Sequence, residues 1–444
     1  MTIESSAVGR IITDAALLHA FAPLEGFPSA ALAVSGGPDS MALMHLASRW
    51  LAIKRRSSGA VAVLTVDHGL RAESAAEAAF VAAQAERLGF AHATLRWEGD
   101  KPKTGIQAAA RRARYSLMTA YCVSRNIACL VTAHTEDDQA ETFLMRLRRG
   151  SGLDGLAAMA AVSAHGGVPL VRPLLGVSKA RLIAYVRSLA IPYVNDMSNS
   201  SLHFERVRLR HAMKAFASAG VTAPAVARSA ARLGRSREAL SIAAEEFLER
   251  NFSVTNLGQG KIGLEAFLAL PSEIALRVLS QVVALIGGKE EAPRMQKAER
   301  LLESLRAGKR EAALGGCLAI AAPGTLNFYR EPGRLKVAPV ACRPAGTCTW
   351  DGRFVLNFSM GLSGNMSVAP LGARGWALYR KALHERHLTS SAGRLAAVTT
   401  PALWDGARLI FAPALGFAGA GISGDPEPVM LKLVPRLSHF LEPT

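Results

Sequence analysis

Up to about Leu189, short apolar runs alternate with longer stretches whose apolar positions recur at helical spacing. The apolar runs predict strands at Ala30–Val34, Val61–Val66, His92–Trp97 and Ile127–Ala133. The stretches between them predict helices at Pro38–Ile53, Ala72–Leu88 and Ile106–Arg125. Such alternation is typical of βαβ units in a doubly wound parallel sheet, whose ligands bind at the carboxyl ends of the strands.

The pattern becomes helical after Gly220 and mixed after Gly315. Apolar residues recur every seven positions, which predicts a helix with one apolar stripe, at Val226, Leu233, Leu240 and Phe247. Further helices are expected at Pro271–Ile286 and Met295–Leu305. Segments of β type follow at Cys317–Ala321, Thr325–Arg330, Arg353–Phe358 and Arg408–Ala412. We therefore expect an α/β catalytic domain at residues 1–215, a helical domain at 216–312 and a smaller mixed α/β C-terminal domain at 313–444.

The charge balance of the 444-residue chain favours a polyanionic partner. The chain carries 52 Lys and Arg residues against 35 Asp and Glu residues, which gives a net charge of +17. Nucleic acid is the first partner to consider, although the same charge also keeps a protein soluble by repulsion. The start of the chain has no signal-peptide pattern, and no long apolar run occurs. We expect a cytoplasmic protein with no membrane segment and no stable protein partner.

The most specific local motif follows the first predicted strand and consists of Ser35, Gly36, Gly37, Pro38, Asp39 and Ser40. Its glycines let backbone N–H groups approach a phosphate, and the helix start that follows adds donors and a positive dipole end. The serine hydroxyls can donate to phosphate oxygens, and Asp39 can hold Mg²⁺. No lysine follows the glycines, so this is not a Walker loop. The alternative is a glycine-rich turn that only connects strand and helix.

Polar residues also cluster after the fourth predicted strand. His134, Asp138 and Glu141 recur at helical spacing and therefore project to one side of a helix start. Carboxylates at such a position can simply complement the helix dipole. Their location at the carboxyl end of a strand, beside the phosphate motif, instead favours Mg²⁺ or the amino groups of a cationic substrate as ligands.

Two weaker motifs belong to the same expected edge of the sheet. The second predicted strand ends in Asp67 and His68, which could contact a nucleotide base or ribose, or cap the following turn. On the third predicted helix, Arg111 and Arg114 share one face. They could clamp a phosphate or form an ordinary solvated basic face. The residues alone leave both pairs of alternatives open.

A basic segment lies between Phe204 and Arg237, where eight basic residues accompany one acidic residue, Glu205. The basic residues are Arg206, Arg208, Arg210, Lys214, Arg228, Arg232, Arg235 and Arg237. A helix that packs through its apolar stripe leaves them on its other faces, where they can bind RNA phosphates. An ordinary charged surface is the alternative, because only the excess of one sign separates the two.

Together the motifs resemble those of the tRNA(Ile)-lysidine synthase family, which are ATP pyrophosphatases with an SGGxDS loop. The resemblance begins with Ser35–Ser40, Asp67–Arg71, Ala110, Arg111, Arg114, Tyr115, His134, Asp138, Glu141 and Thr142. It continues through Arg148–Leu156, Arg172–Leu175, Asp196–Asn199, Arg206 and Arg210. Val207 departs from the asparagine usual in the family, and Ala373–Trp376 matches the family's C-terminal motif only faintly.

The resemblance implies the fold of an N-type ATP pyrophosphatase and an RNA-modifying ligase reaction. The substrate would be the first-anticodon-position cytidine of an isoleucine tRNA with a CAU anticodon. ATP would adenylylate the carbonyl oxygen at ring carbon 2, and the ε-amino group of free L-lysine would then displace AMP to give lysidine. Positioning and charge neutralisation provide most of the catalysis in such transfers.

The resemblance also implies roles for individual residues of this chain. ATP would bind Ser35, Gly36, Gly37, Pro38, Asp39 and Ser40, with Asp39 also holding Mg²⁺. Asp138 and Glu141 would bind the lysine, and Arg111 and His134 would stabilise charge at the adenylylated base. Catalysis would depend on Asp39, Arg111, His134 and Asp138. The tRNA would contact Arg206, Arg210, Arg228, Arg232 and Arg235. The helical domain at 216–312 would be a tRNA-binding domain, and the C-terminal domain at 313–444 would also contact the tRNA.

Two rival functions fit parts of the sequence. Another tRNA-modifying ATP pyrophosphatase, such as a thiolase, would need paired reactive cysteines, but the five cysteines include no C-x-x-C pair. The same spacing argues against a disulfide framework or a zinc site. An RNA-binding protein with a vestigial ATP site is a rival of another class, but the intact phosphate motif and acidic cluster argue against it.

Overall fold

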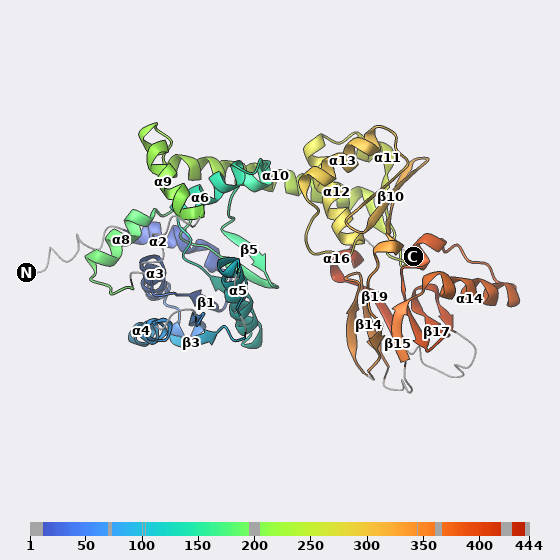
Figure 1. Ribbon diagram of the computed structural model, residues 1–444, viewed down its shortest axis with the longest axis horizontal. Coiled ribbons are helices and arrows are strands. Elements are labelled where there is room, and N and C mark those ends of the chain that lie inside the picture. The colour runs from blue at the N-terminus through green and yellow to red at the C-terminus, as the bar shows by residue number, and fades with distance from the viewer. Residues whose placement is uncertain are drawn as a thin grey trace, which may run out of the picture. The chain divides into compact units, whose positions relative to one another are not determined.

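The computed structural model describes residues 12–69, 73–99, 101–102, 104–194, 205–343, 345–359, 366–418 and 429–439. The chain forms two compact units, Met1–Arg237 and Glu238–Thr444 (Figure 1). The division falls within helix α10 (Ala223–Asn251), so each unit contains part of this helix. Among the described residues, no helix combines the length and apolar character that a membrane crossing requires.

The first unit contains a six-stranded sheet with the strand order β3-β2-β1-β4-β6-β5. All neighbouring pairs are parallel except β5 and β6. The strands are β1 (Ala30–Ala33), β2 (Val61–Asp67), β3 (Ala91–Arg96), β4 (Cys129–Val131), β5 (Val162–His165) and β6 (Val168–Val171). The helices are α2 (Asp14–Phe21), α3 (Pro38–Lys54), α4 (Ser74–Arg87), α5 (Ile106–Ser124), α6 (Glu136–Leu147), α7 (Leu153–Leu156), α8 (Lys179–Ser188) and α9 (Glu205–Ser218).

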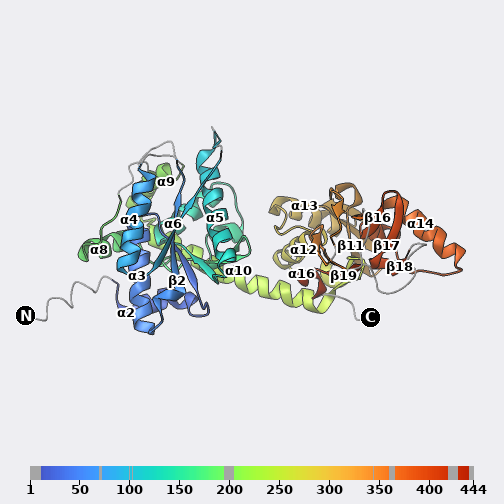
Figure 2. The same cartoon turned by 90° about the horizontal axis from the view of Figure 1, so that it is seen from below.

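Helices cover both faces of this sheet, which confirms the doubly wound fold predicted from the sequence. Neighbouring strand residues point to opposite faces. Leu32 is buried in one cluster with residues of α2, α3, α4 and α8, whereas Ala31 is buried in another with residues of α5. Figure 2 shows α3 and α4 on one side of the sheet and α5 on the other. Because both faces are covered, β1, β2 and β4 are mainly apolar runs in the sequence, whereas the edge strand β3 is partly exposed and includes His92, Thr94 and Arg96.

The strand order reverses at the centre of the sheet. Strand β1 pairs with β2 on one side and with β4 on the other. The carboxyl ends of β1 and β4 therefore flank the topological switch point, where ligands of open α/β sheets bind. The phosphate motif follows β1 and the acidic cluster follows β4. The fold thus brings together two motifs that are far apart in the sequence.

The second unit is built on three antiparallel sheets, with orders β7-β8-β11-β10-β9, β12-β15-β16-β17-β18 and β13-β14-β19. The strands are β7 (Phe252–Val254), β8 (Gly260–Gly263), β9 (Glu311–Leu314), β10 (Cys317–Ala322), β11 (Thr325–Arg330), β12 (Val340–Ala341), β13 (Thr347–Trp350), β14 (Phe354–Phe358), β15 (Met366–Pro370), β16 (Pro401–Asp405), β17 (Arg408–Ala412), β18 (Phe417–Ala418) and β19 (Val429–Leu433). The helices are α11 (Leu264–Leu268), α12 (Ser272–Ile286), α13 (Met295–Arg306), α14 (Gly372–Glu385), α15 (Arg394–Ala397) and α16 (Pro435–Ser438).

One buried cluster runs through most of the second unit. It joins Leu248 of α10, Leu279 of α12 and Leu302 of α13 to Phe328 of β11 and Phe354 of β14. The helical part and the mixed part of this unit therefore share a hydrophobic core. The division into separate domains at 216–312 and 313–444 stays a prediction.

A buried ion network supports this unit. Asp351 accepts hydrogen bonds from Nε and Nη2 of Arg330, at 2.9 and 3.0 Å, and from Nε of Arg353 at 2.8 Å. The side chains of Arg330, Asp351 and Arg353 are 3%, 6% and 0% exposed. Arg353 also donates to the carbonyl oxygen of Thr399, just before β16. Burial lowers the pKa of Arg353 to about 10, which leaves its guanidinium charged at neutral pH.

We expect Asp351→Asn to destabilise the second unit, because two buried guanidinium groups lose their counter-ion. Breaking a buried ion network from one side costs about 3–5 kcal/mol in the free energy of unfolding. The control is Glu385→Gln, which removes the partner of Lys381 in a pair whose side chains are 61% and 75% exposed. Such surface ion pairs contribute little to the free energy of unfolding. Denaturant unfolding measures both variants, and equal stabilities would contradict the argument.

Candidate active site

The phosphate loop is held in shape by its two serines. Ser40 Oγ donates to the carbonyl oxygen of Gly37 at 2.9 Å and accepts from the backbone N–H of Ser35 at 3.2 Å. The Ser35 hydroxyl lies 3.4 Å from Ser40 Oγ. Gly37 is the N-cap residue of α3, Pro38 stands in its first turn and no side chain caps the helix. The first N–H groups of α3 are therefore left for an anion.

The two glycines of the loop serve different needs. Gly36 has φ +86°, a conformation that side chains disfavour, and a Cβ there would lie 3.3 Å from Val194 Cγ2. Its carbonyl oxygen accepts the N–H of Val194 at 2.9 Å. Gly37 has an ordinary φ of −71°, and a Cβ there would meet nothing closer than Ser35 Oγ at 3.9 Å. The fold itself therefore requires only the first glycine, and the second keeps the approach to a phosphate open.

Asp39 is suited to a divalent cation. Its Oδ2 lies 3.1 Å from Nζ of Lys179, while its buried Oδ1 has no hydrogen-bond partner in the described part of the chain. Burial raises the pKa of Asp39; Lys179 opposes this shift, and Asp138 and Asp137 add to it. A carboxylate oxygen without a protein partner, near other carboxylates, fits Mg²⁺. Among the described residues, no group of three His, Cys, Asp or Glu side chains is arranged to hold a metal ion.

The acidic cluster begins with a helix cap. Thr135 is the N-cap residue of α6, and Asp138 Oδ2 accepts from its N–H and its hydroxyl, both at 2.9 Å. This is a capping box, so one oxygen of Asp138 serves the helix start. Glu141 lies one turn later and is only 3% exposed. His134 Nδ1 lies 2.9 Å from Thr132 Oγ1. The roles of His134, Asp138 and Glu141 toward substrate stay predictions.

The sequence analysis missed Lys179, which joins the starts of three helices. It is the first residue of α8, its backbone N–H donates to Asp137 Oδ2 of α6 at 2.6 Å, and its ammonium pairs with Asp39 of α3. The backbone N–H of Glu136 also donates to the carbonyl oxygen of Val177, just before α8. A lysine in the first turn opposes the helix dipole, and this was the only signal in the sequence.

The two arginines of α5 reach different neighbours. Arg111 lies over the ring of Tyr115, with its guanidinium carbon 5.1 Å from the ring centre. Tyr115 is itself buried and packs against the ring of His165. Arg114 lies near His68, whose pKa is lowered first by burial and then by the charge of Arg114. Arg111 thus makes a cation–π contact with Tyr115, and its exposed side chain stays a candidate for the substrate.

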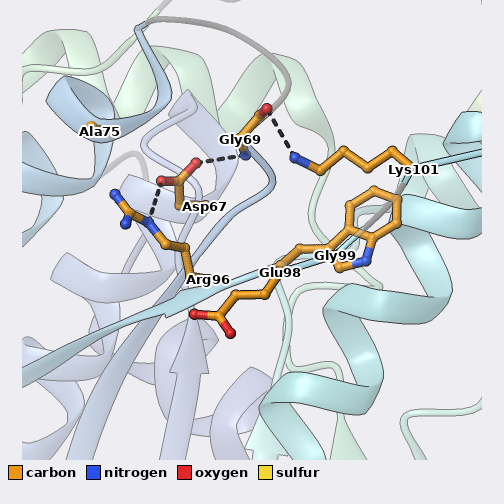
Figure 3. Close-up of a pocket in the computed structure, with 8 residues that line it drawn as sticks. Asp67, Gly69, Ala75, Arg96, Glu98, Gly99 and Lys101 are labelled. Carbon is orange, nitrogen blue, oxygen red and sulfur yellow. Dashed lines mark hydrogen bonds and ion pairs between the residues drawn. The ribbon is translucent and has the colours of Figure 1, made fainter.

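A cavity of about 500 Å³ opens beside the carboxyl ends of β2 and β3 (Figure 3). Its lining consists of Asp67, Gly69, Ala75, Arg96, Trp97, Glu98, Gly99 and Lys101. Asp67 Oδ1 accepts the N–H of Gly69 at 2.8 Å, so Asp67 caps the turn, one of its two predicted alternatives. Lys101 Nζ donates to the carbonyl oxygen of Gly69 at 3.0 Å. Leu70 and Arg71 of this turn lie outside the described residues.

Three of the basic residues predicted to contact tRNA lie on the first part of α10, where the side chains of Arg228, Arg232 and Arg235 are exposed. Burial raises the pKa of Glu136 at the start of α6, and the nearby charge of Arg228 opposes that shift. This part of α10 therefore lies near the acidic cluster. Arg206 and Arg210 belong to α9, but their side chains lie outside the described part of the structure, as does Asp196–Asn199.

Comparison with known proteins agrees with this geometry. A family model described as a PP-loop domain matches residues 12–215, so the first unit is a PP-loop, ATP-binding domain. The tRNA(Ile)-lysidine synthase of Ruegeria pomeroyi is 40% identical over 87% of this chain and 88% of the relative. That of Rhodopseudomonas palustris is 48% identical over 64% of this chain and 82% of the relative. The chain belongs to the tRNA(Ile)-lysidine synthase family, which confirms the resemblance seen in its motifs.

Among solved structures, the chain is similar to the U34-tRNA thiolase NcsA from Methanococcus maripaludis. The TM-score is 0.41 at 16% identity, over 52% of this chain and 77% of that chain. At this distance the likeness carries no argument about function.

Substitution of the glycines tests the backbone of the loop. Alanine at position 36 must adopt a disfavoured φ and press against Val194, so Gly36→Ala is expected to lower the free energy of unfolding of the first unit by roughly 1–3 kcal/mol. Gly37→Ala adds the same methyl group in an ordinary conformation and is the matched control, with an expected change within about 0.5 kcal/mol. Denaturant unfolding compares them. If the two variants are equally stable, Gly36 is not a constraint on the fold.

Proposed function

We propose that this protein joins L-lysine to carbon 2 of the first-anticodon-position cytidine in CAU-anticodon isoleucine tRNA, consuming ATP and forming lysidine. The main support is structural: the phosphate loop and the acidic start of α6 both lie at the switch point between β1 and β4. The name of the relatives, which match the chain over most of its length, supports the same reaction. The new bond joins carbon and nitrogen, so the enzyme is a ligase.

The phosphate loop would hold the triphosphate of ATP. Backbone N–H groups at the start of α3 and the hydroxyl of Ser35 are the donors, aided by the helix dipole. The hydroxyl of Ser40 donates to the carbonyl oxygen of Gly37 and would have to rotate to donate to a phosphate. Asp39 would hold Mg²⁺ through Oδ1, and the metal when bound supplies charge neutralisation at the phosphates. These groups are preorganised by the bonds among Ser35, Gly37 and Ser40. Rigid donors of this kind stabilise developing charge effectively.

The acceptor would be a cytidine splayed out of the anticodon loop. A single-stranded base can enter such a site without breaking base pairs. Its oxygen at carbon 2 attacks the α-phosphorus, the bond to the β-phosphate breaks and pyrophosphate leaves. The adenylylated base then carries positive charge in its ring, and AMP is the next leaving group. Arg111, held over Tyr115, and His134, held at Thr132, would stabilise negative charge on the phosphate that bridges base and adenosine.

The nucleophile would be the ε-amino group of lysine, bound by Asp138 and Glu141. Asp138 Oδ2 belongs to the capping box, so Oδ1 is the oxygen that can face a ligand. Glu141 is buried, and carboxylates in such surroundings bind an ammonium group strongly. The ammonium must lose a proton before it attacks carbon 2. Burial makes the charged amine less favourable, and a carboxylate can accept that proton.

The basic part of α10 would receive the anticodon stem. Arg228, Arg232 and Arg235 are exposed, and Arg228 lies near the start of α6. Arginines on one helix can contact successive phosphates along a strand, and these contacts position the RNA without reading its sequence. Arg206 and Arg210 of α9 are proposed to extend this surface. A cytoplasmic location agrees with a tRNA substrate, and a thiolase reaction is not favoured by the named relatives.

The reaction itself is the first test. Purified protein, ATP, Mg²⁺ and labelled lysine are incubated with an unmodified isoleucine tRNA transcript bearing CAU, and with a methionine tRNA as the control. We expect label only in the isoleucine transcript. Asp39→Asn should reduce incorporation at least about 100-fold, because the charge that holds the metal is lost. Folded protein that incorporates no lysine would refute the proposed reaction.

A second test concerns the basic face of α10. The double variant Arg232→Glu, Arg235→Glu is expected to weaken tRNA binding and to flatten its salt dependence, because phosphate contacts release counterions. Filter binding at several salt concentrations measures both effects.

The matched control is Lys54→Glu, Arg55→Glu at the end of α3. These two residues are also basic and exposed, and they lie outside the predicted tRNA contacts. If both double variants lose affinity equally, the effect comes from net charge and not from a contact on α10.

A further inference from the structure

Lys179 is a cation beside the phosphate loop for which the proposed mechanism has no task. Its Nζ lies 3.1 Å from Asp39 Oδ2, and its backbone N–H donates to Asp137 Oδ2 at 2.6 Å. The second contact fixes the start of α8 against the start of α6. The ammonium is therefore carried on a long side chain whose base is held firmly beside the loop.

Helix stability does not explain a lysine at this position. The first turn of a helix favours anions, and Lys179 is the first residue of α8, with Ser178 as its side-chain cap. The stability gained from the ion pair with Asp39 does not explain a lysine at this position either. The side chains of Lys179 and Asp39 are 36% and 21% exposed, and partly exposed pairs contribute little to folding. A function toward a ligand accounts better for the cation.

The charges around the loop indicate which ligand. The loop lacks the lysine that accompanies a Walker motif, and its own side chain Asp39 repels a triphosphate. Asp137 and Asp138 also act on Asp39. An approaching ATP thus meets carboxylates with a cation already among them. If Asp39 holds Mg²⁺, the ammonium of Lys179 would lose its partner carboxylate, while the backbone N–H of Lys179 would still donate to Asp137.

We propose that Lys179 is a phosphate-binding residue of this site, whose ammonium passes from Asp39 to the triphosphate when ATP binds. This inference rests on the proposed use of ATP at the loop. When the bond between the α-phosphorus and the bridging oxygen breaks, its electron pair stays on pyrophosphate, and Lys179 neutralises part of that charge. It thus supplies from α8 the charge that other phosphate loops carry within their own sequence.

Binding of α,β-methylene-ATP in the presence of Mg²⁺ tests the inference. This probe cannot be cleaved between the α- and β-phosphates and needs neither tRNA nor lysine, so the outcome is independent of lysidine formation. Lys179→Met should weaken binding roughly 10- to 100-fold, the effect of losing a charge-assisted hydrogen bond. Lys179→Arg should restore most of the affinity. Isothermal titration calorimetry measures each variant.

The matched control is Lys54→Met. Lys54 also has a side chain that is 36% exposed and pairs with a carboxylate, Glu25, at 2.6 Å. It ends the same helix that begins at the loop, about 24 Å away at 1.5 Å per residue. The Lys54→Met variant should bind α,β-methylene-ATP with the affinity of the unaltered protein. An affinity loss in Lys54→Met as large as that in Lys179→Met would overturn the inference.

A double-variant cycle separates direct contact from an effect through Asp39. In the Asp39→Asn background, Lys179→Met should still weaken binding of the probe, because the ammonium itself contacts phosphate. If Lys179→Met has no effect in that background, Lys179 only positions Asp39 and the inference is wrong. Thermal unfolding of all variants checks that the first unit remains folded.

Discussion

The left-handed backbone at Gly36 is the constraint on which the nucleotide site depends. It turns the chain from β1 into α3 so tightly that the helix begins at the switch point with its N–H groups uncapped. The same residue binds Val194 through its carbonyl oxygen. The loop is therefore set by backbone geometry before any side chain contributes, and Asp39 and Ser40 take their places because α3 starts where it does.

Three helix starts meet around this loop, and their side chains determine its charge. Asp39 stands in the first turn of α3, and Asp137 and Asp138 stand in that of α6. The dipoles of both helices stabilise these carboxylates, and Lys179 at the start of α8 is the cation bound among them. With three carboxylates against one ammonium, these side chains carry an excess of negative charge without a ligand. Such an excess favours a metal ion or a cationic amine, either of which would offset it.

Much of this arrangement could be predicted from sequence, and the exceptions have physical reasons. Strands β1 to β4 match their predicted ranges within two residues. Strands β1, β2 and β4 are predictable because they are largely buried between the helices of both faces, whereas β3 is a partly exposed edge strand. The phosphate loop could be predicted because adjacent glycines between a strand and a helix are typical of turns that bind phosphate. The capping box of α6 is visible in the sequence, because Thr135 precedes Asp138 by three positions. The spacing of the acidic residues also fits a metal or amine ligand, so the local pattern does not decide between the two roles. The contact of Lys179 depends on topology, which no local pattern reveals.

In the C-terminal part, packing can explain a residue that the sequence pattern assigned to a family motif. Gly375 belongs to the faint match at Ala373–Trp376, and a Cβ there would lie 2.6 Å from Leu371 Cδ1. Packing alone thus requires this glycine. Within the same unit, Asp351 neutralises Arg330 and Arg353, which come from either side of it in the sequence. A shortened protein that ended after α13 would lose both the core shared with β14 and this network. A boundary at residue 312 would therefore divide a shared core, whereas the two compact units divide at residue 237.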